Sequence, residues 1–203
     1  MKNKFQILIT LIIIFAFISC GSLNRKYPKS NFYTLNVGNI ENKVSQGNDD
    51  LKIMRVRLNS GYYLQDFNYR LDKNKFTNDF YNKFYKPIDT IVSSELYKWF
   101  SNSELFGQVV PQNSVVSTRY FLYANILDIY ADFSEKPSKA VLNMQFFLTD
   151  ESGDTPEVIF TSVYNRESDL NDSLPSTIVD GWNEELKNIL NDFENDLSEL
   201  SIF

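Results

Sequence analysis

The chain lacks the side chains on which most enzyme chemistry depends. It has no histidine and a single cysteine, Cys20, among 203 residues. A Ser-His-Asp or Cys-His nucleophile therefore cannot be assembled, and the Cys and His ligands that zinc prefers are missing from the soluble part. An intramolecular disulfide is also impossible, so packing of the core has to hold the fold. These absences leave only carboxylate, lysine or tyrosine chemistry open, and we expect a protein that is not an enzyme and has no metal or cofactor.

Two further absences reduce the number of possible functions. Neither a G-x-x-x-x-G-K-[ST] loop nor a G-x-G-x-x-G loop is present, so these routes to nucleotide binding are unsupported. Acidic residues outnumber basic ones, 26 to 20, and this balance disfavours nucleic acid as a partner. Carboxylate chemistry is the main catalytic alternative, but no spacing selects a pair among the candidates Asp66, Asp79, Asp128 and Asp132.

The lone cysteine closes an apolar N-terminal run. Lys2 and Lys4 precede a nearly unbroken apolar stretch over Phe5–Ile18, and the small Ser19 stands directly before Cys20. A charged start, a short apolar middle and a small residue at the cleavage point are typical of a secretory signal. The alternative is an uncleaved anchor with an incidental cysteine. The spacing favours a signal peptide over residues 1–19.

The segment Phe17-Ile18-Ser19-Cys20 resembles the bacterial lipobox, in which the cysteine is acylated. This resemblance implies lipidation of Cys20 and a lipidated tether over residues 20–31. Several acyl chains anchor a protein stably where one chain does not. The residue after the cysteine is Gly21, whereas an aspartate at that position retains many lipoproteins at the inner membrane. We therefore expect a lipid-anchored protein of the cell envelope, at the outer membrane and facing the periplasm.

Residues 32–203 read as one domain of strands and two helices. Apolar residues recur at helical spacing over 87–102 and 175–200, and each helix begins at a proline. Runs typical of strands cover 32–37, 51–58, 63–71, 76–84, 105–110, 119–133, 140–150 and 158–164. The pattern predicts an α+β fold, with a single mixed or antiparallel sheet and two main helices packed on one face. Asp150–Asp154 reads as a hairpin turn, or alternatively as a calcium loop without EF-hand spacing.

The predicted sheet has more apolar surface than two helices on one face can cover. The strand over 119–133 is apolar on both sides, with Ile129 assigned to the side opposite Ile126, and the aromatic hairpin over 62–84 adds more. Large exposed apolar patches usually mark interaction sites. The predicted contact with a second copy or an envelope partner falls on Tyr63, Phe67, Tyr69 and Tyr81. The alternatives are a sheet that packs on its own core and a loop over 38–50 that folds across it.

Several short segments resemble, in this order, the ABC-type transport auxiliary lipoproteins, the family that includes the paraquat-inducible protein C type. They are "FYTL" from Phe32, "LKIMRVRL" from Leu51 with the following "YYL", Tyr69-Arg70, "FYKPI" from Phe84, "LYANILDIYADF" from Leu122 and "FFLTDESG" from Phe146. Two departures are Asn59-Ser60-Gly61, where the family has a proline, and Lys86, where it has an acidic residue. The resemblance implies a fold like the N-terminal domain of TolB and a ring-shaped oligomer.

The resemblance also implies a function. We expect a membrane-anchored periplasmic accessory lipoprotein of an ABC-type or MCE-type lipid transport system, which acts by binding and docking. Its partners would be the membrane, through the N-terminal lipid, the transporter or MCE-type components, and further copies of itself. The alternative is an outer-membrane biogenesis or ligand-binding lipoprotein unrelated to ABC transport.

Overall fold

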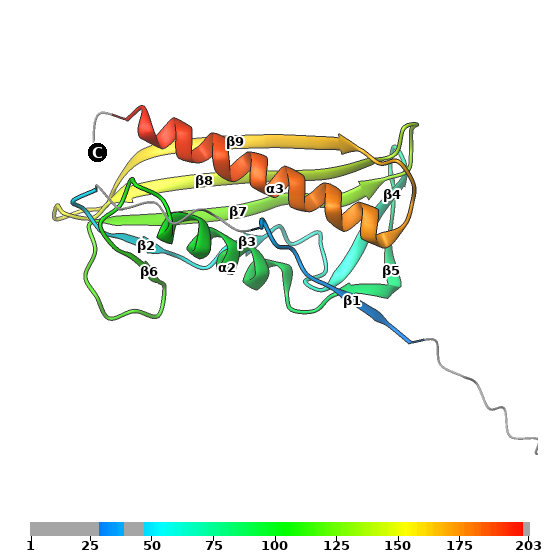
Figure 1. Cartoon of the computed structure of the whole chain (residues 1–203), viewed down its shortest axis with the longest axis horizontal. Helices are drawn as coiled ribbons and strands as arrows, with labels where there is room; N and C mark the ends of the chain where they lie inside the picture. Colours follow the sequence, from blue (N-terminus) through cyan, green and yellow to red (C-terminus); the bar gives the residue numbers. More distant parts are fainter. Residues whose placement is uncertain (1–28, 39–46, 201–203) are drawn as a thin grey trace, which may run out of the picture.

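The structure, a computed structural model, describes residues 29–38 and 47–200. Nine strands form one mixed sheet, and both helices of this part pack on the same face (Figure 1). In chain order the elements are β1 (Asn31–Tyr33), β2 (Leu51–Ile53), β3 (Arg57–Leu58), β4 (Asp66–Asp72), β5 (Lys75–Phe84), α2 (Ile88–Ser101), β6 (Val109–Pro111), β7 (Tyr120–Asp132), β8 (Lys139–Asp150), β9 (Glu157–Asp169) and α3 (Pro175–Ser198). The predicted α+β architecture is confirmed. Cys20 and the signal and tether residues before position 29 lie outside the described residues.

The long strand β7 organises the sheet. β8 pairs with it antiparallel along its length, and β9 pairs antiparallel with β8. On the other side, three parallel strands follow one another along β7: β2 beside its start, β3 beside its middle and β4 beside its end. β6 lies outside β2, and β5 and then β1 lie outside β4. The N-terminal half of the chain therefore reaches the sheet as short pieces, whereas β7–β9 form a continuous meander.

Helices α2 and α3 bury the stripes that their sequences predict. The tryptophans, one in each helix, are both buried, as predicted: Trp182 completely and Trp99 nearly so. The Trp182 ring meets Phe67 edge-on, with 5.0 Å between centroids, and its Nε1 donates to the carbonyl of Tyr130 at 3.3 Å. Trp99 Nε1 donates to Glu194 at 2.8 Å, which ties α2 to α3. Such aromatic contacts add to the free energy of burial.

The predicted alternation of β7 is wrong in its second half. Ile126 pairs with Met144 and Asp128 with Asn143, so Leu127 is an extra residue, a β-bulge. Beyond the bulge the side chains change faces. Ile129 therefore lies buried on the helix side rather than on the opposite side.

Other boundaries also differ from the prediction. The segment over 51–58 is not one strand, because the backbone leaves the ladder after β2 and rejoins it at β3. Its buried side chains are Leu51, Ile53 and Val56. The edge strands β1 and β6 are shorter than predicted and β9 is longer. In the described residues, no helix is long and apolar enough to cross a membrane.

Candidate binding groove

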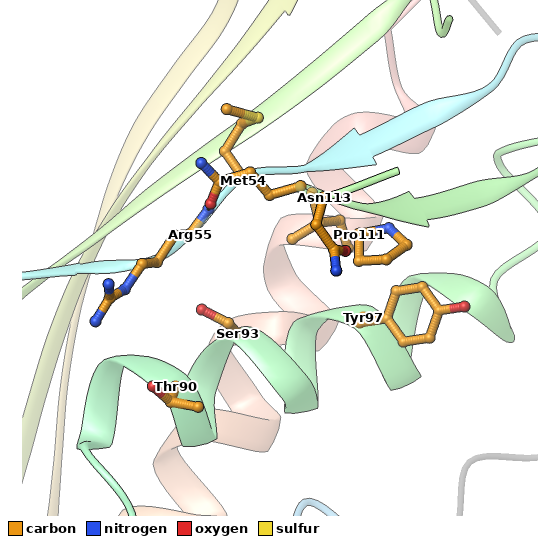
Figure 2. A pocket seen from close by; sticks show the side chains of 9 residues that line it. Met54, Arg55, Thr90, Ser93, Tyr97, Pro111 and Asn113 are labelled. Carbon is orange, nitrogen blue, oxygen red and sulfur yellow. The ribbon is translucent and has the colours of Figure 1, made fainter. Parts of the chain in front are cut away.

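A groove runs between α2 and the strands β2 and β6 (Figure 2). Its first hollow has a volume of about 450 Å³. Tyr97, Pro111 and Asn113 lie together at one end of it, and Arg55 extends away from that end (Figure 2). The residues that line this hollow are Ile53, Met54, Arg55, Thr90, Ser93, Tyr97, Pro111, Gln112 and Asn113.

The local sequence explains why the groove is open. Thr90, Ser93 and Tyr97 follow one another at helical spacing, on the flank of α2 beside its buried stripe. On the other side, β2 leaves the sheet after Ile53 and β6 ends at Pro111. Both strands stop here, and the segment between β2 and β3 lies opposite the helix flank, where the Val56 amide donates to Ser93 Oγ.

A second hollow of about 460 Å³ adjoins the first and shares Met54, Arg55 and Gln112 with it. Its lining also includes the exposed Arg57 and the half-buried Tyr123. We call the two hollows together the α2 groove. Its charge is therefore uneven, with Tyr97 and Pro111 at one end and two guanidinium groups at the other, one of which is paired with the Asp89 carboxylate in the lining.

Hydrogen bonds fix the polar side chains of the groove. The Arg55 guanidinium donates to Asp89 Oδ2 from Nε at 3.1 Å and from Nη2 at 2.7 Å. The Asp89 carboxylate is almost completely buried, whereas the Arg55 side chain is 61% exposed. Ser93 Oγ donates to the Asp89 carbonyl and accepts from the amide of Val56. The Arg55 amide donates to the side-chain oxygen of Gln112 at 3.1 Å.

This arrangement of side chains suits the binding of a ligand. The Ser93 hydroxyl is engaged on both sides, so it has no free base beside it to make it a nucleophile. An anionic group near Arg57 and the exposed side of Arg55 would gain charge-assisted hydrogen bonds. An apolar chain attached to that group would lie along Tyr97 and Pro111. The chemistry of the α2 groove thus suits an anionic amphiphile.

The four predicted contact residues do not form one surface. Phe67 is completely buried between Phe84 and Trp182, so its assignment to a partner surface is wrong. Tyr69 is half-buried, and its hydroxyl donates to Asp79 at 2.6 Å. Burial, with that hydrogen bond to a carboxylate, raises the Tyr69 pKa. Tyr63 and Tyr81 are exposed, and for them partner contact stays a prediction.

The candidate catalytic carboxylates are held in structural contacts. Asp66 pairs with Lys83 at 2.9 Å. The other three accept hydrogen bonds from two side chains each. The donors are Tyr62 and Asn143 for Asp128. They are Arg70 and Ser134 for Asp132, and Tyr69 and Asn82 for Asp79. The acidic turn after β8 begins at Asp150, whose carboxylate accepts from Arg119. In the described part of the chain, no three potential ligands gather to hold a metal ion.

Sequence reasoning missed the groove because its two sides are distant in the chain. Arg55 and Arg57 alternate within an apparently continuous strand, which made them look like an ordinary solvent-facing side. The available signal was the pair of arginines two residues apart in an acidic chain. Nothing in the pattern placed Tyr97 opposite them.

Comparisons with known proteins establish the fold alone. No protein-family model and no curated protein match the chain. A solved protein from Xanthomonas campestris, described by the family model DUF330, is 12% identical, with 82% of this chain and 90% of that one covered and a TM-score of 0.63. A second solved structure, of an uncharacterized protein, is 10% identical over 83% of this chain and 99% of that one, with a TM-score of 0.65. The chain thus shares its α+β architecture with these proteins.

Proposed function

We propose that this protein is a lipid-anchored accessory protein of the bacterial cell envelope that binds an anionic amphiphile in the α2 groove. The observation that carries the proposal is the uneven groove, apolar at Tyr97 and Pro111 and cationic at Arg55 and Arg57. A fatty acid or phospholipid has the same two-ended character. The protein acts by binding and presenting this ligand rather than by changing it.

The N-terminal sequence and the family resemblance support the cellular setting of the proposal. Acylation of Cys20 would hold the domain at the outer membrane, on the periplasmic side. There it would dock with components of an ABC-type or MCE-type transporter that moves lipid. Binding of an amphiphile without transporter docking would instead support the alternative, a ligand-binding or biogenesis lipoprotein unrelated to ABC transport.

Titration with a fluorescent fatty acid tests the groove. Arg57→Ala removes one guanidinium, and we expect about tenfold weaker binding, the loss of one charge-assisted hydrogen bond. Tyr97→Ser removes part of the apolar wall and should weaken binding of long chains more than short ones. Lys187→Ala, at an exposed position of α3, is the charge-matched control. Equal affinities for all four proteins would exclude the α2 groove as the site.

Mass spectrometry tests the anchor separately. The mature N-terminus should be Cys20 carrying a diacylglyceryl group, and Cys20→Ser should abolish both acylation and processing at this position. A mature N-terminus elsewhere, without lipid, would remove the lipoprotein part of the proposal and leave the groove to be judged by the titration. Co-purification of the lipidated protein with transporter components then separates the leading function from the alternative.

A further inference from the structure

The end of the domain that follows the tether exposes a cluster of aromatic and cationic side chains. It consists of Phe32 on β1, Phe80, Tyr81 and Lys83 on β5, and Tyr85 and Lys86 after it. Phe80, Tyr85 and Phe32 are 71%, 67% and 59% exposed, which is unusual for such large apolar groups. We call this cluster the β1–β5 patch.

Contacts link the members of the patch into one surface. Phe32 pairs with Lys83 across the parallel β1–β5 ladder, so both side chains leave the sheet on the same side. Lys83 Nζ lies 5.9 Å from the centre of the Phe80 ring, and Phe80 meets Tyr81 edge-on. The amide of Tyr85 donates to the carbonyl of Tyr33, next to Phe32. Phe32, Tyr85 and Lys86 also line one shallow hollow.

The β1–β5 patch lies close in the chain to Cys20, the proposed site of the lipid. The described domain begins at Lys29, only nine residues after Cys20. Nine residues span at most about 32 Å even when fully extended, whereas α3 alone, with 24 residues, is about 36 Å long. The chain enters at the end of the long axis where α3 begins, opposite the loop after β6 (Figure 1). A lipid on Cys20 therefore keeps the β1 end of the domain closest to the bilayer.

The chemistry of the patch matches that surface. Aromatic side chains are enriched at the level of lipid headgroups, and lysines near a membrane are attracted by anionic lipids. Residues 29–33 and 72–86 together contain five lysines and two aspartates, although the whole chain has a net charge of −6. These two segments thus carry a local excess of basic residues, in which Lys83 is already paired with Asp66 at 2.9 Å.

We propose that the β1–β5 patch rests on the bilayer to which the protein is anchored and sets the orientation of the domain. The inference depends on the proposed acylation of Cys20. In this orientation α3 points away from the lipid from its first turn, and the far end of the sheet, with the loop after β6, is presented to the periplasm. The occupant of the patch is the lipid headgroup region, not a second copy or a protein partner.

Fluorescence quenching in the lipidated full-length protein tests the orientation. The native tryptophans, Trp99 and Trp182, are buried and give a constant background. Phe80→Trp and Tyr85→Trp place a reporter in the patch, and Val115→Trp places the control in the fully exposed loop after β6. The proteins are reconstituted into phosphatidylethanolamine–phosphatidylglycerol vesicles with and without brominated acyl chains. We expect blue-shifted, strongly quenched emission from both patch reporters and unquenched emission from Trp at position 115.

Each other outcome overturns the inference in a distinguishable way. Unquenched, red emission from both patch reporters in protein whose lipid is verified by mass spectrometry would mean that the patch faces water. Blue-shifted but unquenched emission would mean that a protein surface covers it. Absence of lipid on Cys20 would refute the proposed anchor and the membrane contact together. Lys86→Glu in the Phe80→Trp background should reduce quenching, and unchanged quenching would contradict the role of this lysine.

Discussion

The two faces of the sheet are stabilised in different ways, and β8 shows this within adjacent residues. On the helix side, Ala140, Leu142, Met144, Phe146 and Leu148 are all completely buried. On the opposite side, which we call the open face, the same strand carries the half-buried Asn143, Gln145 and Phe147. Phe146 stacks on Phe193 of α3 with 4.3 Å between ring centroids. The helix side depends on close packing, whereas the open face combines polar partners with a few buried residues such as Val141.

Polar partners from the same chain contact part of the aromatic surface on the open face. Lys52 Nζ lies 5.1 Å from the centre of the Phe121 ring, and the Arg70 guanidinium lies 5.2 Å from the centre of Tyr130. Asn125 donates to Gln145 across the β7–β8 ladder. The comparison shows that cationic and amide side chains of the same chain can pack on the second side of a strand that is apolar on both sides. Phe76, which meets the Tyr130 ring edge-on, is still 52% exposed, and the more exposed rings Phe80 and Tyr85 lie in the β1–β5 patch.

The sharpest way to break this comparison is to truncate two consecutive phenylalanines. Phe146→Ala should lower the free energy of unfolding by about 3–5 kcal/mol, because it empties a completely buried aromatic site. Phe147→Ala should lower it by only about 1 kcal/mol, because that ring already contacts solvent. Urea denaturation of both variants measures the difference. Equal losses would show that the open face is as closely packed as the helix side.

A smaller effect is expected from the ion pair on the open face. Arg70 donates to Asp132, a residue that is only 5% exposed, and Arg70→Met leaves that carboxylate without its cation. We expect a loss of about 1–3 kcal/mol in the free energy of unfolding. Arg166→Met is the matched control, because Arg166 and Asp192 are each more than a third exposed. That variant should lose at most about 1 kcal/mol, and a larger loss from it would reverse the ranking.

The smallest effect is a pH dependence that comes from the same carboxylate. Burial acts to raise the Asp132 pKa, but hydrogen bonds from Arg70 and Ser134 outweigh it and hold the pKa below its ordinary value of 3.8. A carboxyl group with a lowered pKa stabilises the folded state above its unfolded pKa and loses that contribution as pH falls through the folded value. The free energy of unfolding should thus fall more steeply below about pH 4 in the wild type than in Asp132→Asn. Parallel pH profiles would contradict the assignment.

The sequence predicts the helices and the meander well, because their signals are local. Ile91, Trp99 and Trp182 are buried where the 3.6-residue period puts them, and the even positions of β8 face the core as their alternation indicates. Phe67 was misjudged because alternation defines two sides of a strand without saying which of them faces the core. Its partners, Phe84 and Trp182, are brought to it by tertiary packing.

The groove was beyond prediction for a related reason. It exists because β2 and β3 pair with β7, about 70 residues further along the chain, and leave the ladder between these two contacts. None of the residues between Ile53 and Arg57 is a proline or a glycine, the residues that usually mark such a break in a strand. The residues that line the groove could be recognised singly, but their meeting depends on pairing between distant segments.

The bulge at Leu127 adds one residue to β7 that has no partner in β8 and reverses the alternation of the side chains that follow. Even-numbered residues face the helices before the bulge, and odd-numbered residues face them after it. The strand therefore has two patterns of alternation that meet at Leu127. Deletion of Leu127 would remove the bulge and give β7 one regular alternation, with every other side chain still on its present face. Deletion of Asn125 would instead exchange the faces of nearby residues. Length variation in this strand is therefore tolerable at a single place, where the ladder already contains one residue too many.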